Sequence, residues 1–188
     1  MKQNDASQFL RSSWMTERIL VVDSTLEDVP YLTQIFNACG YVEPWDPTFH
    51  TVVDDELTRL VLQSIATTGA DQSFRLQCLW SKMEDKCLGY FHIDHCPPGI
   101  RQRSTVWLSM FVMHPSFQRK QFAQEVVTGL AQQLTQCGYA AIWIGVYLKN
   151  WPAMRFWIQQ GFTKIIKYDG ASVISENGHA RLILEKRL

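Results

Sequence analysis

The chain has 188 residues, a length that suits one domain with a sizeable buried core. Hydrophobic residues make up 46% of it, with ten Phe and seven Trp, which is typical of a globular protein and excludes a mainly disordered chain. Eighteen Lys and Arg balance eighteen Asp and Glu, so a broad nucleic-acid-binding surface is disfavoured. We therefore expect no nucleic-acid partner.

The amino-terminal residues and the cysteines bear on localisation. The stretch MKQNDASQFLRSSWMTERI has no apolar signal-peptide core, and no apolar run approaches the roughly 18–20 residues of a membrane span. The five cysteines are odd in number and widely spaced, unlike a disulfide framework or a paired zinc motif. These features predict a cytoplasmic protein without a membrane partner.

The first half of the chain predicts a strand followed by two helices. Residues 1–16 are polar and are expected to form an N-terminal extension or a frayed helix, so that a single domain spans residues 17–188. Capping residues and terminal glycines then delimit the helices. The expected elements are a strand at 18–24, a helix at 24–40, an aromatic and proline-containing loop at 41–50, and a helix at 53–69.

The second half predicts a hairpin and then alternating strands and helices. The run TVWLSMFVM at 105–113 is apolar on both alternating faces, which indicates a central strand covered on both sides. The other expected elements are strands at 74–82 and 86–94, a helix at 122–137, a strand at 139–147, a helix at 150–161, and strands at 163–168 and 179–188. This order predicts an α/β (α+β) domain, a mixed sheet with helices on both faces.

A short cationic loop lies between the central strand and the helix that follows it. The stretch HPSFQRKQFA at 114–123 places Arg119 and Lys120 just before a helix start. The first turn of a helix leaves about four backbone N–H groups unpaired and carries a partial positive charge. Such a loop suits a diphosphate, although basic residues near a helix start are also common on plain solvated surface.

A second block gives the loop its context. The strand that ends at VYLKNWPAMRFWIQQGF begins its loop and helix at Asn150. Together the blocks Q-R-K-Q-F-A at 118–123 and N-W-P-A-M-R-F-W-I-Q-Q-G-F at 150–162 resemble the GCN5-related N-acetyltransferase (GNAT) superfamily. The element order over residues 18–188 matches that family as well, so the resemblance covers nearly the whole chain.

The resemblance implies a fold and a cofactor. The implied fold is a mostly antiparallel sheet of about seven strands whose central strands splay apart, and the implied co-substrate is acetyl-CoA. Its pantetheine arm would lie along the main chain of the central strand, and its diphosphate on the loop before the helix. The implied cofactor-binding residues are Phe111, Val112, Met113, Gln118, Arg119, Lys120, Gln121, Phe122, Ala123, Asn150 and Trp157.

Two residues depart from the family pattern. Gln121 replaces a glycine that allows close backbone approach to phosphate, and it can still offer its N–H if its φ is helical. Trp157 stands where the family commonly has a tyrosine that protonates the departing thiolate, and indole is not a useful acid. The usual proton donor is therefore missing, and no catalytic residue is assigned.

The acceptor side is less defined than the cofactor side. Trp45, Asp46 and Tyr147 are predicted to contact an amine acceptor, which is a small molecule or a peptide. The sequence leaves the oligomeric state open, and a homodimer is compatible with it. Candidate general bases or proton relays are Glu43, Asp46, His50, Ser109, Tyr147, Asp169, Glu176 and His179.

The stretch HIDHC at 92–96 also has a metal-site interpretation. His92 and Asp94 would point the same way on a strand, and His95 and Cys96 follow them. The usual ligand spacing is missing, and no distal Cys-x-x-Cys or His-x-x-His completes the set. We therefore expect no metal site.

The leading hypothesis is an acetyl-CoA-dependent N-acetyltransferase that transfers the acetyl group directly to a primary amine in a ternary complex. The alternative is a catalytically weakened acyl-CoA-binding or regulatory domain, which both departures favour. A protein–protein or oligomerisation domain without a ligand explains neither the loop nor the second block.

Overall fold

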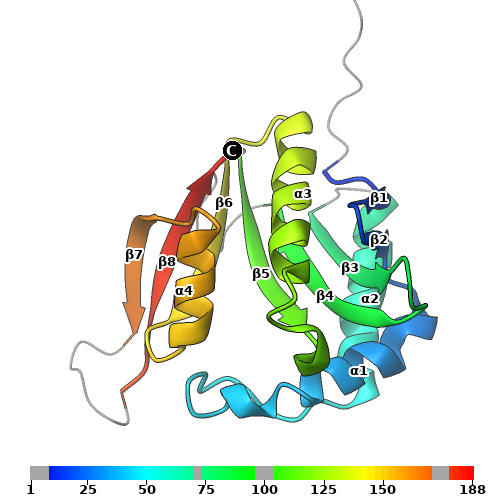
Figure 1. Cartoon of the computed structure of the whole chain (residues 1–188), viewed down its shortest axis with the longest axis horizontal. Coiled ribbons are helices and arrows are strands. Elements are labelled where there is room, and N and C mark those ends of the chain that lie inside the picture. Colours follow the sequence, from blue (N-terminus) through cyan, green and yellow to red (C-terminus); the bar gives the residue numbers. More distant parts are fainter. Residues whose placement is uncertain (1–8, 70–72, 96–103, 171–177) are drawn as a thin grey trace, which may run out of the picture.

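The computed structural model describes residues 9–69, 73–95, 104–170 and 178–188, which form one open sheet with helices on both faces (Figure 1). Its strands are β1 (Ser13–Met15), β2 (Ile19–Asp23), β3 (Phe74–Ser81), β4 (Cys87–Asp94), β5 (Thr105–Met113), β6 (Ala141–Tyr147), β7 (Lys164–Gly170) and β8 (Ala180–Arg187). Within these ranges the eight strands follow the order β1-β2-β3-β4-β5-β6-β8-β7. Every neighbouring pair is antiparallel except β5 and β6.

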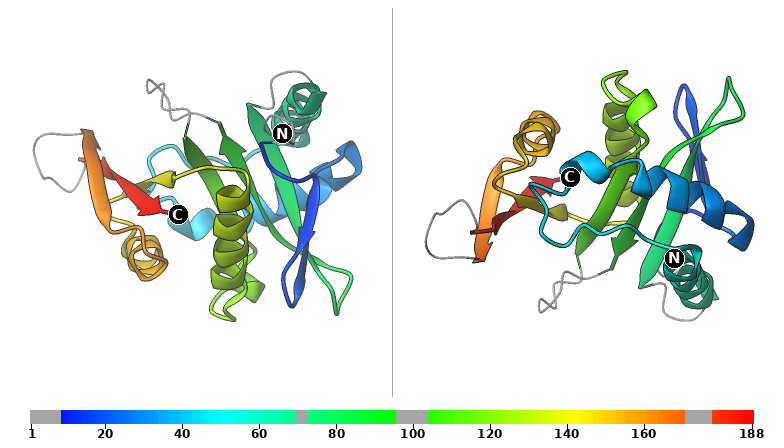
Figure 2. Two further views of the ribbon diagram at one scale, coloured as in Figure 1. Left: turned by 90° about the horizontal axis from the view of Figure 1, so that it is seen from above. Right: turned by 90° about the horizontal axis from the view of Figure 1, so that it is seen from below.

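The helices form two layers around this sheet (Figure 2). They are α1 (Val29–Asn37), α2 (Asp54–Gly69), α3 (Phe122–Gln136) and α4 (Trp151–Gln159), with short 3-10 turns η1 (Leu26–Asp28), η2 (Gly40–Val42) and η3 (Pro115–Phe117). The apolar stripe of α3 packs on one face of the sheet with α4, while α1 and α2 cover the other face. Within the described ranges, none of the helices is both long and apolar enough to cross a bilayer.

The predicted α/β fold is confirmed, with two corrections at the amino-terminal end. In the described part of the chain the sheet has eight strands rather than about seven, because β1, which lies inside the segment expected to be an extension, pairs with β2. Phe9 and Leu10 are also buried, with 2% and 0% of their surface exposed. Three residues are too few for a visible alternation, and Trp14 alone marks the buried face.

The helix expected at 24–40 is shorter than its sequence pattern. The main chain forms η1 first, where the Thr25 N–H donates to the Asp28 carboxylate at 2.7 Å, as expected of a capping box. The α-helix then ends at Asn37, and Gly40 opens η2 instead of terminating α1. This early end lets the chain turn toward the carboxyl end of β5, where the Cys39 thiol donates to the Met113 carbonyl at 3.6 Å.

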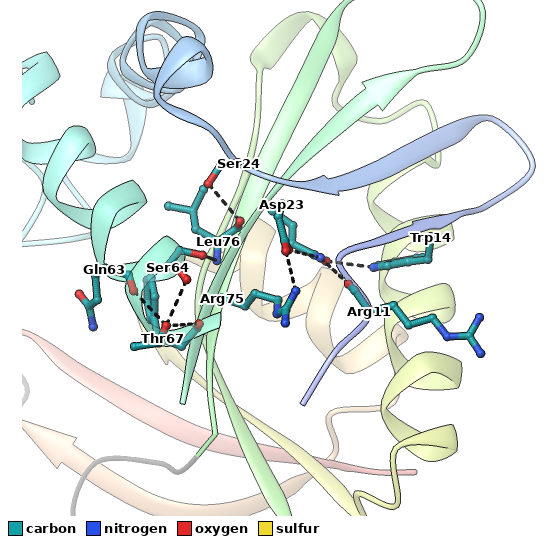
Figure 3. Close-up of polar contacts among 11 residues, drawn as sticks. Arg11, Trp14, Asp23, Ser24, Gln63, Ser64, Thr67, Arg75 and Leu76 are labelled. Atoms are coloured by element: carbon teal, nitrogen blue, oxygen red, sulfur yellow. Dashed lines mark hydrogen bonds and ion pairs between the residues drawn. The ribbon is translucent and has the colours of Figure 1, made fainter. Parts of the chain in front are cut away.

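A buried polar group joins the first three strands (Figure 3). Arg75 on β3 is 1% exposed, and its Nη1 is 2.5 Å from the Asp23 carboxylate on β2. Gln77 donates to the other Asp23 oxygen and to the Arg11 carbonyl, each at 2.8 Å, and accepts from the Trp14 indole at 3.0 Å. The group fixes β1 and β2 at the edge of the sheet.

Two hydroxyl groups of α2 fix that helix on β3 (Figure 3). The Ser64 hydroxyl accepts from the Leu76 amide at 2.9 Å, and the Thr67 hydroxyl donates to the Phe74 carbonyl at 2.8 Å. Because buried main-chain groups are costly to leave unpaired, these bonds also set the height of α2 on the sheet.

Candidate active site

The two central strands part early, which gives the site its shape. β5 and β6 pair in parallel only at Thr105–Ala141, Val106–Ile142 and Trp107–Trp143. Figure 1 shows them together near the carboxyl terminus of the chain and diverging toward the end of β5, where α3 begins. The predicted splay of the central strands is therefore confirmed.

The main chain of β5 presents its polar groups to this parting. The His114 N–H donates to the Leu88 carbonyl at 2.9 Å, and Val112 faces Tyr90 in the same register. In an antiparallel pair every second residue turns its N–H and C=O away from the partner strand. Phe111 and Met113 therefore direct theirs away from β4, toward the place where β6 has separated, whereas Val112 uses its own within the sheet.

The loop before α3 has a specific backbone conformation. Arg119 and Gln121 both lie in the left-handed region, at φ 58° and φ 67°. Gln121 therefore does not meet the condition of a helical φ, and its conformation is one that favours the glycine of the family pattern. Gln121 is the N-cap of α3, so the free N–H groups of the first turn begin next to it.

Gln121→Gly is expected to raise the free energy of unfolding by about 0.5–1 kcal/mol, measured by urea denaturation. A left-handed L-residue costs about 1–2 kcal/mol, of which the greater freedom of unfolded glycine offsets part. Gln132→Gly, an exposed right-handed position in α3, is the matched control and should lose about 1 kcal/mol. An equal loss at both positions would contradict the left-handed conformation of Gln121.

Gln118 and its neighbours stabilise the end of β5. Its side-chain amide donates to the Met113 carbonyl at 3.0 Å and to the Tyr41 hydroxyl at 2.6 Å. Burial raises the pKa of Cys39 to about 11, so that side chain stays a thiol and remains a donor to the same carbonyl. The Gln118 amide is thus used to hold the segment after α1 against β5, and its predicted role toward a cofactor stays a prediction.

Arg18 is a residue near the loop that the sequence patterns did not single out. Its side chain lies over the Phe122 ring at 4.3 Å and donates to the Lys120 carbonyl at 3.3 Å. It also forms an ion pair with Glu125 in the first turn of α3, at 2.7 Å. Although burial raises the pKa of Glu125, hydrogen bonds from Thr16 and Arg18 lower it overall, so Arg18 offsets an acid beside the cationic loop.

The second block lies at the start of α4 and on its buried face. The Asn150 side chain accepts from the Ala153 N–H at 3.1 Å, as expected of an N-cap. Trp157 is 9% exposed, and its ring centroid lies 5.6 Å from that of Phe111 and 5.1 Å from that of Phe162. Trp157, which occupies the position of the family tyrosine, thus contacts β5 at Phe111, beyond the point where β5 and β6 part.

The predicted acceptor-side residues have local partners. The Asp46 carboxylate accepts from the Thr48 N–H at 2.9 Å and from its hydroxyl at 2.6 Å, so it stabilises its own turn. The Trp45 ring packs edge-on against Tyr41 at 6.2 Å. Tyr147, at the end of β6, packs edge-on against His179 at 6.5 Å. Contact of Trp45, Asp46 and Tyr147 with an acceptor stays a prediction.

Several candidate bases are held in ion pairs or lie elsewhere. His50 and Glu56 are 2.9 Å apart, and this hydrogen bond raises the pKa of His50. The Asp169 carboxylate accepts from Arg181 at 2.9 Å. Glu43 is exposed in the turn after η2, and Glu176 lies outside the described residues. His50 and Asp169 would each have to leave a partner to act as a base.

Ser109 differs from the other candidates because it touches two titratable groups. Its hydroxyl lies 2.6 Å from His92 Nδ1 and donates to the Asp94 carboxylate at 2.7 Å. Burial lowers the pKa of His92 to about 4, and burial raises the pKa of Asp94 although the bond from Ser109 opposes this. The sequence analysis considered Ser109 as a proton relay and His92 with Asp94 as metal ligands, and only the register of β4 and β5 brings Ser109 to the other two.

The metal interpretation of HIDHC finds no further ligands in the described ranges. His92 and Asp94 share a face of β4, as expected, but His95 instead contacts the Tyr139 hydroxyl at 2.6 Å. Cys96 lies outside the described residues. Among residues 9–69, 73–95, 104–170 and 178–188, no group of three His, Cys, Asp or Glu is placed to hold a metal ion.

Solved structures with this fold are numerous, and three illustrate the likeness. A GNAT-family protein from Chromobacterium violaceum has 12% identity and a TM-score of 0.75, covering 100% of this chain and 92% of that one. The enzyme from Salmonella typhimurium that modifies the N-terminal serine of ribosomal protein L7/L12 has 11% identity and a TM-score of 0.73, with 92% and 96% covered. YncA from Salmonella typhimurium, solved with its cofactor acetyl-CoA, has 16% identity and a TM-score of 0.68, with 90% and 94% covered.

Sequence comparison adds the family to the fold. No curated protein matches the chain. The model of the acetyltransferase (GNAT) family matches residues 31–162, which include the parted strands, the cationic loop and all of α4. The chain therefore belongs to the GNAT family of acetyltransferases.

Proposed function

We propose that this protein is an acetyl-CoA-dependent N-acetyltransferase that acts by direct transfer in a ternary complex. The observation that carries the proposal is the parting of β5 from β6 after Trp107, next to the amino-terminal end of α3. The loop before α3 offers cations and helix N–H groups to the diphosphate of acetyl-CoA, and the main chain of β5 offers hydrogen-bonding groups to its extended pantetheine arm. Bound acetyl-CoA in a structural neighbour supports the proposal.

Different residues of this chain would bind the diphosphate, the pantetheine arm and the thioester of acetyl-CoA. Arg119 and Lys120 bind the diphosphate together with the first-turn N–H groups of α3. The main chain of Phe111 and the N–H of Met113 pair with the pantetheine arm as another strand would, while the Met113 carbonyl keeps its bonds from Gln118 and Cys39. One of these N–H groups then points at the thioester carbonyl, where negative charge develops in the tetrahedral intermediate. Trp157 packs beside the arm and supplies no proton, so the leaving thiolate is protonated by water.

The acceptor in this proposal is a primary amine of a small molecule or peptide. The Salmonella typhimurium neighbour that modifies the N-terminal serine of ribosomal protein L7/L12 supports a peptide amino terminus as one acceptor class. Direct transfer requires little more than holding the amine and the thioester together with the amine neutral.

Acetyl-CoA is expected to raise the melting temperature in a saturable way, since a ligand that binds only the native state adds about 2.7 kcal/mol at a concentration 100 times its Kd. Thermal unfolding with acetyl-CoA, with CoA and with ATP measures this. CoA should stabilise almost as well, and ATP much less. No shift at millimolar acetyl-CoA would contradict the proposal.

A catalytically weakened acyl-CoA-binding domain is the second candidate function. Trp157 in place of the usual tyrosine, together with the left-handed Gln121, favours it. Thiol release from acetyl-CoA separates the two candidates, with tyramine, spermidine and a peptide that begins with Ser as acceptors. Stabilisation by acetyl-CoA without thiol release from any of these amines would favour the binding domain.

A further inference from the structure

Ser109 occupies an irregular position in β5. His92 pairs with Met110 and Ile93 pairs with Leu108, so Ser109 is the extra residue of a β-bulge. Bulges redirect a side chain that regular alternation would place elsewhere. Here the Ser109 hydroxyl reaches His92 Nδ1, the His92 carbonyl and the Asp94 carboxylate, at 2.6, 3.2 and 2.7 Å.

The bulge coincides with the point where the strands part. Trp107 is the last residue of β5 that pairs with β6, and Ser109 lies two residues beyond it. Residues 109–111 are the only part of β5 that keeps partial exposure, whereas the strand is buried on both sides of them. An arm laid along Phe111 and Met113 from the α3 end therefore brings its terminal thioester next to Ser109.

The face on which this group lies is the one covered by α1 and α2. Asp94 pairs with Phe74 on one side and Trp107 on the other, so these side chains share a face. Phe74 belongs to the core beneath α2, and the His92 ring lies 5.4 Å from the Phe74 ring. The α4 side chains that meet β5, Trp157 among them, lie on the opposite face.

The surroundings of the group are uncharged in the described residues. The cross-strand neighbours of His92 are Leu76 on β3 and Met110 on β5, and those of Asp94 are Phe74 on β3 and Trp107 on β5. The nearest further titratable side chain on that face of β4 is Tyr90, and burial raises its pKa well above the ordinary value. Among the residues that the structure describes, Asp94 has no cationic partner, and burial raises its pKa, which makes it a stronger base than an exposed aspartate.

We propose that Asp94 and Ser109 form the proton-accepting pair of the transfer reaction, with Ser109 in contact with the acceptor nitrogen and His92 holding Ser109 in place. The inference rests on the proposed function and adds its general base. With the Ser109 hydroxyl donated to Asp94, His92 Nδ1 is left to donate its hydrogen to Ser109 Oγ. Ser109 is then the catalytic residue, and Asp94 acts through it.

The step balances without a further reactant. The neutral amine nitrogen attacks the thioester carbon, the N–C bond forms, and the C–S bond breaks as the tetrahedral intermediate collapses. The proton leaving nitrogen passes to Ser109 Oγ while the Ser109 proton passes to Asp94. The CoA thiolate takes a proton from water, and Asp94 returns its proton to solvent between turnovers.

Ser109→Ala and Asp94→Asn are each expected to lower kcat about 100-fold, the scale of general base catalysis, with KM for acetyl-CoA nearly unchanged. Activity of the unsubstituted protein should fall as pH drops through the raised pKa of Asp94, because the carboxylate must be ionised to accept the proton. That acid limb should disappear in Asp94→Asn. Asp94→Glu should recover part of the rate, which a merely structural role would not predict.

Thiol release with acetyl-CoA and tyramine, spermidine or the Ser-initiated peptide provides the readout. Asp55→Asn, the same change at an exposed position of α2, is the matched control and should keep full activity. Stabilisation by acetyl-CoA shows whether each variant is folded and still binds the donor. Full kcat and an unchanged pH profile in both Ser109→Ala and Asp94→Asn would overturn this inference but leave the proposed function standing. No turnover by the unsubstituted protein with any amine would overturn the proposed function, and this inference with it.

Discussion

Replacing Arg119 and Lys120 together by Glu is expected to weaken acetyl-CoA binding at least about 100-fold at low salt. Charge-assisted hydrogen bonds contribute about 1.5–3 kcal/mol each, and reversing both charges adds repulsion of the diphosphate. The left-handed Arg119 and Gln121 bend the loop at the first turn of α3, so the two cations and the helix N–H groups act at one place. Calorimetric titration of acetyl-CoA into both proteins measures the loss.

Salt and a matched double variant make this test specific. Because mobile ions screen exposed charges, the difference between the two proteins should shrink as ionic strength rises. Arg59→Glu with Lys167→Glu makes the same change in net charge on α2 and β7 and should leave affinity nearly unchanged. Equal affinity of the Arg119–Lys120 variant and the unsubstituted protein at low salt would show that the diphosphate lies elsewhere.

The long periodic segments made most of the fold predictable. The apolar stripe of residues 122–137 and the two-sided runs at 105–113 and 139–147 gave helix and strands within a few residues of their bounds. The sequence does not predict β1, because a strand of three residues is too short to show a period of two. Only its pairing with β2 identifies it as a strand. Arg75 was read as part of an ordinary hairpin strand, since nothing local shows that a cation there is buried.

The candidate site was predictable in place but not in conformation. The blocks located the cationic loop and α4, yet the φ angles of Arg119 and Gln121 follow from how the loop closes between β5 and α3. The contacts of Arg18 with residues more than 100 positions away have no trace in local periodicity. Ser109 and Asp94 meet only because a bulge sets the register of two strands, which sequence alternation alone does not reveal.

Asp23→Ala is expected to lower the free energy of unfolding by about 3–5 kcal/mol, because it leaves the Arg75 guanidinium buried without its carboxylate. Only 2% of the Arg75 side chain is exposed, and its Nε has no hydrogen-bond partner among the residues that the structure describes. The substitution also removes the acceptor of one Gln77 hydrogen bond. Urea denaturation followed by circular dichroism measures the change.

The double variant Asp23→Ala with Arg75→Met separates the cost of an unpaired charge from the loss of contacts. If the buried cation causes the loss, removing it as well should restore part of the stability, since an apolar replacement of a buried ion pair is often neutral. Glu84→Ala breaks the exposed pair with Lys86 and should cost less than about 1 kcal/mol. A double variant less stable than Asp23→Ala would instead mean that Arg75 stabilises the sheet through its packed stem, with the ion pair contributing little.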